Sequence, residues 1–509
     1  MSERAPSAGA PGWWPLLLAL GAGAILPLAF APFDFWPLAI ASPLALMRLW
    51  DGAAPRRAAL LGLCFGLGTY SEGTWWLYIS IHGFGGAPAW LSVLLILLLV
   101  AYMASYQALL GWLAARVLPA RGAWRWCAGL PALWLLGEWC RGWFLTGFPW
   151  LSLGYSQTDT WLAGFAPVLG VYGLSAALLV QAGALLACWH GRGRARLAPL
   201  VLIALLWAGG AALARVAWTR PSGAPVPVAI LQGAIPQDEK WQLNNREPTM
   251  ARYRALNDQT AGARLVVWPE AAIPELANEI APYLAQIQGS SRARDADVVM
   301  GVVRLGDNGE DYYNSIIALT TGVAFYDKRH LVPFAEYFPV PAFVRSWLRL
   351  MSLPYSDFRA GAADQAPLLA GGLRLAPSIC YEDAFGSALL AMNTGADVLV
   401  NVTNDAWFGR SPARFQHLQI SRMRALEAGR YLLRAGNDGV SAIIGPHGEL
   451  LAAAPGYQSA VLRGTVVPRS GLPPYAGVGN WAVILLAAAL AAVAARNRRH
   501  VNPPDLPNT

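Results

Sequence analysis

Charged residues are scarce in this chain of 509 residues. They make up 13% of it, against roughly 25% in typical soluble domains, while hydrophobic residues make up 55%. The shortage of charge excludes a wholly soluble globule. It indicates that much of the chain lies in lipid.

Lysine is rarer still. Of the 38 Lys plus Arg residues, only Lys240 and Lys328 are lysine. A planar guanidinium cannot replace a compact, titratable ammonium, so a lysine kept in such a chain is a candidate for chemistry. Survival of two lysines by chance is the alternative.

Cysteine is almost absent from the second half of the chain. Of five cysteines, Cys64, Cys127, Cys140 and Cys188 fall in or beside apolar runs, and Cys380 stands alone in the segment between the last two such runs. This excludes a disulfide framework for that segment. Packing as a small core residue is the ordinary explanation of an unpaired thiol.

Long apolar runs are abundant, and membrane spans of about 17 to 25 residues explain them. Seven such runs precede Trp218 and one lies near the C-terminus. The predicted spans are 13–31, 35–49, 58–79, 89–114, 124–143, 164–188, 198–216 and 479–495. The first is expected to be an anchor and not a cleaved signal peptide, since others follow it promptly.

Arginine marks alternate connections between these runs, which predicts that both termini are cytoplasmic. The arginines concerned are Arg48, Arg56, Arg57, Arg116, Arg121, Arg125, Arg192, Arg194, Arg196, Arg496, Arg498 and Arg499. The net charge of +8 is therefore explained mostly by arginines that set the orientation of the spans. No basic patch with interleaved aromatics indicates nucleic-acid binding. The insert before the last span then lies outside the cytoplasmic membrane.

The predicted architecture is a bundle of eight helical spans with an external α/β domain. Its parts are 1–218 with seven spans, 219–477 as the external domain, 478–499 as the eighth span and 500–509 as a cytoplasmic tail. Strands are expected at 226–232, 264–268, 297–303, 314–319, 373–379, 398–403 and 442–444, and helices at 248–260, 277–290, 384–394 and 414–430. This alternation of short apolar runs and helices is typical of layered α/β folds.

Three regions leave alternatives open. The apolar segment from Phe343 to Phe358 fits a lid on the lipid surface or a packed core helix equally well. Glu72 and Glu138 lie in predicted spans, where ionisable groups are functional candidates. For Glu138, a structural ion pair with Arg141 is favoured by the i, i+3 spacing.

Three reactive groups follow strand-like apolar runs in the external segment. Glu270 follows LVVWP, Lys328 ends FYDK, and Cys380 ends SIC just before a predicted helix, where a helix dipole favours thiolate. Taken singly, they have ordinary explanations as a helix cap, a surface charge and a core residue. No Cys/His spacing suggests zinc, and His330, His417 and His447 are too scattered for a metal site, so neither a metal nor a cofactor is expected.

The sequences WPE at 268–270, YDKRHLVPFAEY at 326–337 and CYED at 380–383 resemble the three catalytic blocks of the nitrilase, or carbon-nitrogen hydrolase, superfamily. With spans on both sides, the whole chain resembles the apolipoprotein N-acyltransferase family. The resemblance implies an αββα nitrilase-like sandwich with a Glu270, Lys328 and Cys380 triad. It also implies supporting roles for Glu336, Tyr381 and Glu382, and a substrate-binding role for Trp241, whose alternative is ordinary packing.

The resemblance also implies a reaction. Cys380 is expected to take an acyl chain from a membrane phospholipid, usually phosphatidylethanolamine, as a thioester, and to pass it to the α-amine of the S-diacylglyceryl cysteine of an apolipoprotein. The expected location is a bacterial inner membrane with the active site on the periplasmic side. The alternatives are a membrane-tethered nitrilase-like amidase acting on a small external substrate, and a transporter with an external sensor domain.

Overall fold

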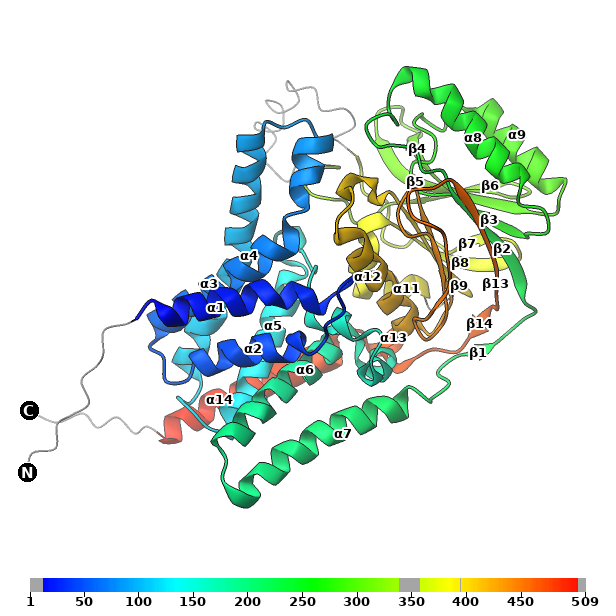
Figure 1. Ribbon diagram of the computed structural model, residues 1–509. Helices are drawn as coiled ribbons and strands as arrows, with labels where there is room; N and C mark the ends of the chain where they lie inside the picture. The colour runs from blue at the N-terminus through cyan, green and yellow to red at the C-terminus, as the bar shows by residue number, and fades with distance from the viewer. Residues whose placement is uncertain (1–11, 338–357, 394, 502–509) are drawn as a thin grey trace, which may run out of the picture.

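The computed structural model describes residues 12–337, 358–393 and 395–501. A helical part and an α/β part lie side by side, and both α1 and α14 belong to the helical part (Figure 1). The candidate lid at 343–358 lies outside the described residues except for Phe358, which forms a parallel bridge with Tyr312.

The helical part contains a helix at each of the eight segments predicted to span the membrane. The helices are α1 (Trp14–Ile25), α2 (Leu38–Leu49), α3 (Pro55–Thr74), α4 (Ala89–Val117), α5 (Leu130–Arg141), α6 (Ala166–His190), α7 (Leu197–Leu213) and α14 (Trp481–Val501). Three helical stretches, at 89–117, 161–190 and 193–213, are long and apolar enough to cross a membrane. Shorter apolar helices lie at 14–29, 38–49 and 481–496. These helices fit an association with the membrane.

Close helix packing in this part depends on small residues. The backbone of α3 approaches that of α4 so closely that a Cβ on Gly62 would lie 2.1 Å from the carbonyl oxygen of Gln107. On its other side, a Cβ on Gly68 would lie 2.1 Å from the carbonyl oxygen of Leu20 in α1. Glycine at such positions lets helix backbones approach each other in lipid, where no hydrophobic force drives helices together.

The α/β part contains two six-stranded sheets and a short two-stranded ribbon of β1 (Arg220–Pro221) and β14 (Arg469–Ser470). The first sheet has the order β13-β2-β3-β4-β5-β6, and the second β12-β11-β10-β9-β8-β7. The strands are β2 (Val226–Gln232), β3 (Leu265–Val267), β4 (Asp297–Leu305), β5 (Tyr312–Leu319), β6 (Val323–Asp327), β7 (Leu368–Ala370), β8 (Leu373–Ile379), β9 (Val398–Thr403), β10 (Leu432–Gly436), β11 (Ala442–Ile444), β12 (Leu450–Ala453) and β13 (Ala460–Val466).

The two sheets pack face to face, with helices on the outside. One apolar core joins residues of both sheets, such as Ile230 and Val267 with Leu375 and Val400. A second core joins the outer face of the first sheet to α8 (Arg246–Asp258) and α9 (Ala281–Arg292). The second sheet is covered by α11 (Gly386–Asn393) and α12 (Ala413–Ala428), giving the αββα layering that the resemblance implied (Figure 1).

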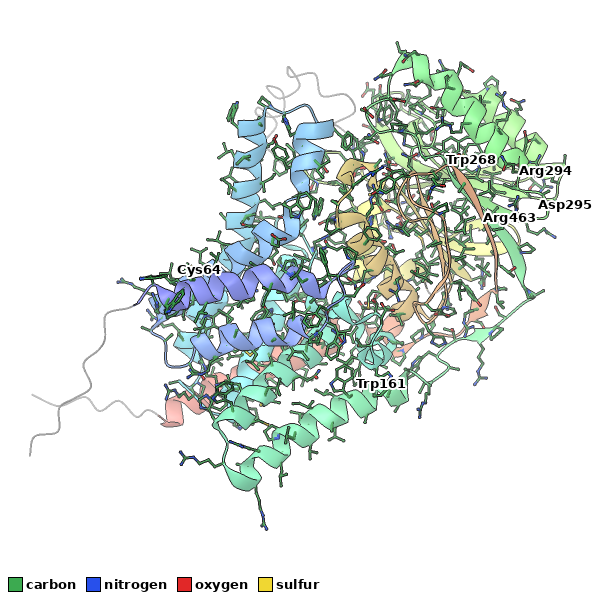
Figure 2. All side chains as sticks on the ribbon, in the orientation of Figure 1. Cys64, Trp161, Trp268, Arg294, Asp295 and Arg463 are labelled. Atoms are coloured by element: carbon green, nitrogen blue, oxygen red, sulfur yellow. The ribbon has the colours of Figure 1, made fainter. Side chains whose placement is uncertain are left out.

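Helix α12 lies between the second sheet and the helical part. Its Glu427 Oε1 accepts a hydrogen bond from the backbone N–H of Val171 at 2.9 Å, and its Gln416 Oε1 accepts one from Trp150 Nε1 at 2.6 Å. The short helix α13 (Pro474–Val478) then leads the chain back to α14. At the opposite end of the α/β part lie the charged side chains of Arg294, Asp295 and Arg463 (Figure 2). The sandwich therefore turns one side toward the helices and presents charge on the other.

Candidate active site

The ends of three strands bring the three predicted reactive residues to one edge of the sandwich. Strands β2, β3 and β4 are parallel, and two antiparallel steps through β5 make β6 run in the same direction. Glu270 after β3 and Lys328 after β6 therefore lie at the same edge of the first sheet. Cys380 follows β8 in the second sheet.

The carboxylate of Glu270 is held in place by its neighbours in the first sheet. Asn314 Nδ2 on β5 donates to Glu270 Oε1 at 2.8 Å, and Lys328 Nζ lies 3.8 Å from the same oxygen. Gly301 on β4 makes room for this turn, because a Cβ there would lie 2.4 Å from the Cα of Glu270. Any larger residue would push the carboxylate away from the ammonium.

Lys328 forms a closer pair with Glu336. Its Nζ donates to Glu336 Oε1 at 2.8 Å, and Asn314 Nδ2 donates to the same oxygen at 2.9 Å. Burial disfavours the ammonium, but Glu336 and Glu270 outweigh burial and raise the pKa of Lys328. Lys328 is 1% exposed and stays charged, so the site holds a fixed positive charge between two carboxylates.

The thiol lies at a strained turn. Cys380 has φ +50, a left-handed conformation that residues other than glycine rarely adopt, and it is the first residue of a 3-10 helix at Cys380–Ala384 that directly follows β8. Burial raises the pKa of the Cys380 thiol, Glu270 adds to this rise, and Lys328 opposes it. The resting cysteine is therefore protonated, and a base must remove its proton before it can act as a nucleophile.

Glu382 joins the turn of the nucleophile to the strand end that carries Lys328. Its Oε2 accepts from the N–H of Ile379 at 2.7 Å, and its Oε1 accepts from the N–H of Arg329 at 2.7 Å. Tyr326 Oη also donates to Oε1, at 3.1 Å. This buried carboxylate fixes the two sheets relative to each other at the site.

Tyr381 points toward the helical part. Its Oη donates to the carbonyl oxygen of Gly147 at 3.1 Å, and its ring packs against Phe148, with ring centroids 6.5 Å apart. Tyr155 Oη donates at 3.3 Å to the carbonyl of Ala384, at the end of the same turn. The loop that follows α5 therefore contacts the turn of the nucleophile directly.

Trp241 is placed less centrally than the other predicted residues. It is 40% exposed, whereas the neighbouring Lys240 is fully buried and its Nζ lies 3.4 Å from the carbonyl oxygen of Glu270. Burial lowers the pKa of Lys240 to about 8. The rarity of lysine was the signal that could have marked Lys240. Asn314 was missed because one asparagine in a strand gives no signal.

The two acidic residues of the predicted spans differ. Glu72 is exposed on α3, while Glu138 is 5% exposed on α5. Within the described residues, no ion pair under 4 Å joins Glu138 to Arg141, so the expected pair is wrong. Glu138 and Arg141 instead form hydrogen bonds with the loop after α5. Arg141 Nη1 donates to the carbonyl oxygens of Phe148 and Trp150, and Glu138 Oε2 accepts from the N–H of Leu153.

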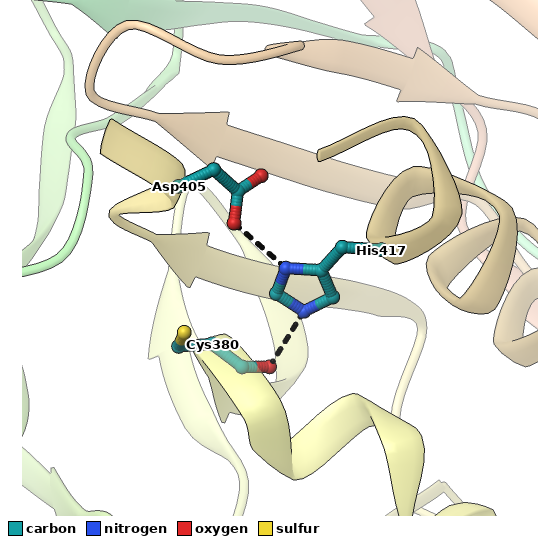
Figure 3. Close-up of side chains that lie close together, drawn as sticks. All are labelled: Cys380, Asp405 and His417. Atoms are coloured by element: carbon teal, nitrogen blue, oxygen red, sulfur yellow. Dashed lines mark hydrogen bonds and ion pairs between the residues drawn. The ribbon is translucent and has the colours of Figure 1, made fainter. Parts of the chain in front are cut away.

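Cys380, Asp405 and His417 lie close enough together to suggest a metal site, although this group contains only one of the three histidines considered in the sequence (Figure 3). The hydrogen bonds exclude this interpretation. His417 Nδ1 lies 2.7 Å from Asp405 Oδ1, and Nε2 lies 3.0 Å from Asp383 Oδ1. These two carboxylates raise the pKa of His417 to about 9, so at neutral pH both ring nitrogens carry protons and neither has a lone pair for a metal.

Two protein families match this chain, one in each part. The family described as "Apolipoprotein N-acyltransferase N-terminal domain" matches residues 22–185, and "Carbon-nitrogen hydrolase" matches residues 227–469. The sandwich and the strand-end residues thus define a carbon-nitrogen hydrolase domain joined to a helical membrane part.

Curated relatives resemble the chain along nearly its whole length. An apolipoprotein N-acyltransferase of Methylococcus capsulatus is 42% identical over 489 residues, covering 96% of this chain and 97% of its own. That of Azotobacter vinelandii is 46% identical over 505 residues and covers 96% of each chain. That of Pseudomonas syringae pv. tomato is 44% identical over 484 residues, covering 94% and 95%. The chain belongs to the apolipoprotein N-acyltransferase family.

Proposed function

We propose that this protein moves a fatty acyl chain from a membrane phospholipid to the α-amine of the S-diacylglyceryl cysteine that begins an apolipoprotein, through a thioester on Cys380. The observation that supports this most is the meeting of Glu270, Lys328 and Cys380 at one edge of the sandwich in a chain of this family. Phosphatidylethanolamine is the proposed donor.

In the first half-reaction, Glu270 takes the proton from the Cys380 thiol, and the thiolate attacks the carbonyl carbon of the sn-1 ester. Negative charge develops on the carbonyl oxygen of the ester, where the Lys328 ammonium and the N–H of Tyr381 stabilise it. The intermediate collapses, the C–O bond breaks, and the leaving alkoxide takes the proton from Glu270. A lysophospholipid departs and the acyl chain stays on sulfur.

In the second half-reaction, the amine of the acceptor attacks the thioester carbonyl. Glu270 takes a proton from the attacking nitrogen, the C–S bond breaks, and the proton returns to the Cys380 sulfur. A thioester suits this step because amines attack it readily, whereas an ester reacts slowly. Glu336 supports both halves by keeping Lys328 charged, and Glu382 keeps the two strand ends in place.

The placement of the site follows from the arginine pattern. We propose eight spans with both termini in the cytoplasm, a periplasmic catalytic domain at 219–477, an eighth span at 478–499 and a cytoplasmic tail at 500–509 of a bacterial inner membrane. Trp241 is proposed to contact substrate from its exposed position. Both substrates would then reach Cys380 from the outer leaflet.

A reconstitution experiment tests the transfer. The purified full chain is incubated in micelles with a phospholipid labelled in its sn-1 chain, with and without a diacylglyceryl peptide. The products are identified and quantified by mass spectrometry. The proposal predicts labelled N-acyl peptide and lysophospholipid in equal amounts. Labelled free fatty acid formed equally with and without peptide would instead show a hydrolase that uses water as acceptor.

A further inference from the structure

A buried charge cluster lies behind Cys380, and none of the chemical steps above uses it. Its ionisable members are Asp383, Asp405, His417 and Arg434, and none of these is more than 1% exposed. Figure 3 shows that the thiol and the carbonyl of Cys380 point in different directions, and that the carbonyl points toward His417. The hydrogen bonds of the cluster to Cys380 are therefore made with its backbone carbonyl, while Asp405 also helps to raise the pKa of the thiol.

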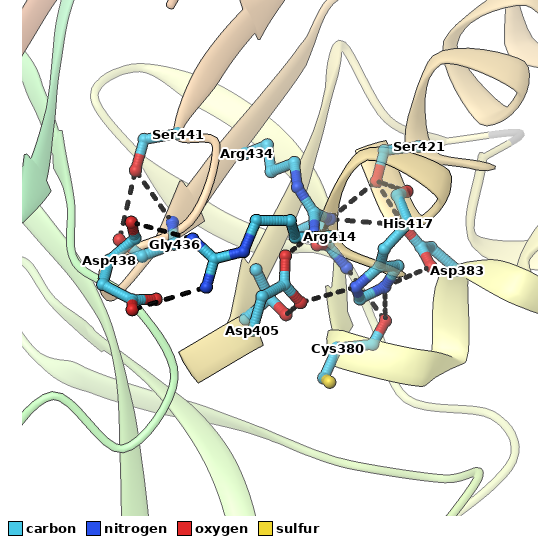
Figure 4. A network of polar contacts seen from close by, with 12 residues as sticks. Cys380, Asp383, Asp405, Arg414, His417, Ser421, Arg434, Gly436, Asp438 and Ser441 are labelled. Atoms are coloured by element: carbon cyan, nitrogen blue, oxygen red, sulfur yellow. Dashed lines mark hydrogen bonds and ion pairs between the residues drawn. The ribbon is translucent and has the colours of Figure 1, made fainter. Parts of the chain in front are cut away.

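His417 lies at the centre of the cluster (Figure 4). Besides its contacts with Asp405 and Asp383, its Nε2 lies 3.1 Å from the carbonyl oxygen of Cys380. Arg434 Nη2 completes the group by donating to Asp405 Oδ2 at 2.7 Å. Ser421 Oγ donates to Asp383 Oδ2, and Arg434 Nη1 donates to Ser421 Oγ at 2.8 Å.

The charges of the cluster balance only when His417 is protonated, since two carboxylates then face one guanidinium and one imidazolium. Burial and Arg434 disfavour the charged ring, but Asp383 and Asp405 outweigh them and raise the pKa of His417 to about 9. An imidazolium has two N–H donors, so it can donate toward Asp405 on one side and toward Asp383 and Cys380 on the other. A neutral imidazole has one N–H, so it could donate only toward Asp405 or only toward Asp383 and Cys380.

The carbonyl of Cys380 and the N–H of Tyr381 belong to the same peptide group. In a planar trans peptide these two groups point in opposite directions. Holding the carbonyl toward His417, with Asn401 Nδ2 as a second donor at 3.4 Å, therefore directs the N–H away from the cluster. The backbone at φ +50 would otherwise relax, because such a conformation persists only where its surroundings impose it.

We infer that His417 is a positioning residue that fixes the Cys380–Tyr381 peptide, so that the N–H of Tyr381 faces the oxyanion of the acyl-transfer intermediate. This inference rests on the proposed role of Cys380 as nucleophile. His417 touches neither substrate nor sulfur in this role. Its effect is on the rate of attack and not on the binding of lipid.

Two double variants test the inference while keeping the cluster neutral. Asp383→Asn combined with His417→Gln removes one charge of each sign and leaves an amide donor for the Cys380 carbonyl. Asp383→Asn combined with His417→Met has a side chain of similar size without a donor. The rate of acyl-Cys380 formation is measured in a single turnover with phospholipid and no acceptor, together with the lipid concentration that gives half the maximal rate.

The expected acylation rate of the methionine variant is about 100-fold below that of the glutamine variant, since a misdirected oxyanion donor costs about 100- to 1000-fold. Half-saturation by lipid is expected to change less than threefold. Equal acylation rates in the two variants would overturn the inference. Failure of the unaltered protein to form any acyl-Cys380 would overturn the proposed function instead.

The pH profile of the unaltered chain gives a readout that does not depend on the variants folding. Below pH 9 His417 is charged, so the acylation rate should fall as the pH rises through about 9, when the imidazolium is lost. The charged groups that face it or its partners are Asp383, Asp405, Arg414 and Arg434. Lys240, whose pKa is about 8, loses its proton at lower pH than His417, so any change in acylation rate that it causes is a separate step near pH 8. A rate that stays level between pH 8.5 and 10 would contradict the inference.

Discussion

The helical part and the α/β part use buried charge in different ways. In the helical part, Arg141 and Glu138 form hydrogen bonds with backbone groups of the loop after α5. In the α/β part, Lys328 lies between Glu270 and Glu336 at strand ends, where the charges face one another. At these two sites, charge holds the backbone in the helical part and is available for chemistry around Lys328 in the α/β part.

The helical part and the α/β part nevertheless contact each other at the nucleophile. Tyr381 Oη donates to the carbonyl of Gly147, next to the carbonyl of Phe148 that Arg141 holds. The membrane part therefore supports one side of the turn that carries Cys380, and the His417 cluster supports the other. Each prediction below tests how far the two parts depend on each other.

The largest effect is expected for Lys328→Met. Loss of an ammonium that receives the oxyanion should lower kcat by about 100- to 1000-fold. The measurement is steady-state N-acylation of a diacylglyceryl peptide. Lys240→Met is the matched control, since it removes the only other lysine, which contacts the carbonyl of Glu270 and not its carboxylate, and it should cost less than tenfold. Equal losses in the two variants would show that ammonium charge in general, and not its position, matters.

A smaller effect is expected for Arg141→Gln in the helical part. Releasing the carbonyls of Phe148 and Trp150 should loosen the support under Tyr381 and lower kcat by about tenfold, since each buried hydrogen bond contributes about 1 kcal/mol. Arg116→Gln, an exposed arginine over Trp112 on α4, is the control and should leave kcat unchanged. If Arg141→Gln has full activity, the helical part does not support the site.

Tyr381→Phe should reduce kcat by only a few-fold. It removes the hydrogen bond to Gly147 but keeps the backbone N–H and the ring that packs on Phe148. Comparison with Tyr381→Ala separates the hydroxyl from the ring, and the alanine variant should be slower. An equal loss in both variants would mean that the hydroxyl alone joins the two parts.

The smallest effect concerns stability and involves His330. Burial and Lys328 lower its pKa to about 4, below the usual value near 6.5. Between these pH values His330 is protonated in the unfolded chain and neutral in the folded chain. The free energy of unfolding should therefore fall as the pH falls from about 6.5 to 4. Thermal melts at stepped pH should show this decline, and His330→Phe, which keeps the stack on Phe385, should flatten it. An unchanged slope in that variant would assign the decline to other groups.

The sequence predicted the elements that follow simple apolar runs. The expected strands at 226–232, 373–379, 398–403 and 442–444 agree with β2, β8, β9 and β11. It missed β10, whose run LLRAG contains the buried Arg434, and β13, whose Arg463 and Gly464 break the apolar pattern. Both strands are specified by partners distant in sequence. β10 pairs with β9, and β13 with β2.

The site was predictable where a reactive residue directly follows a strand, as Glu270, Lys328 and Cys380 do. Glu336 and Glu382, close in sequence to the residues they hold, were also predicted, but other residues that hold the site were not, because their partners lie far away in the chain. Asn314 bridges Glu270 and Glu336, and His417 reaches Cys380 from a helix 37 residues away. One signal was present in α12: polar residues occur on every face of this helix, which indicates partners on all sides.

The most direct test of the account is the intact mass of the full chain after incubation with phospholipid and no acceptor. The predicted result is one added acyl chain, located on the peptide that contains Cys380, and released when a diacylglyceryl peptide is added. The Cys380→Ala variant should show no adduct. Acyl transfer to the peptide at the normal rate by Cys380→Ala, without any acyl-enzyme, would contradict the account.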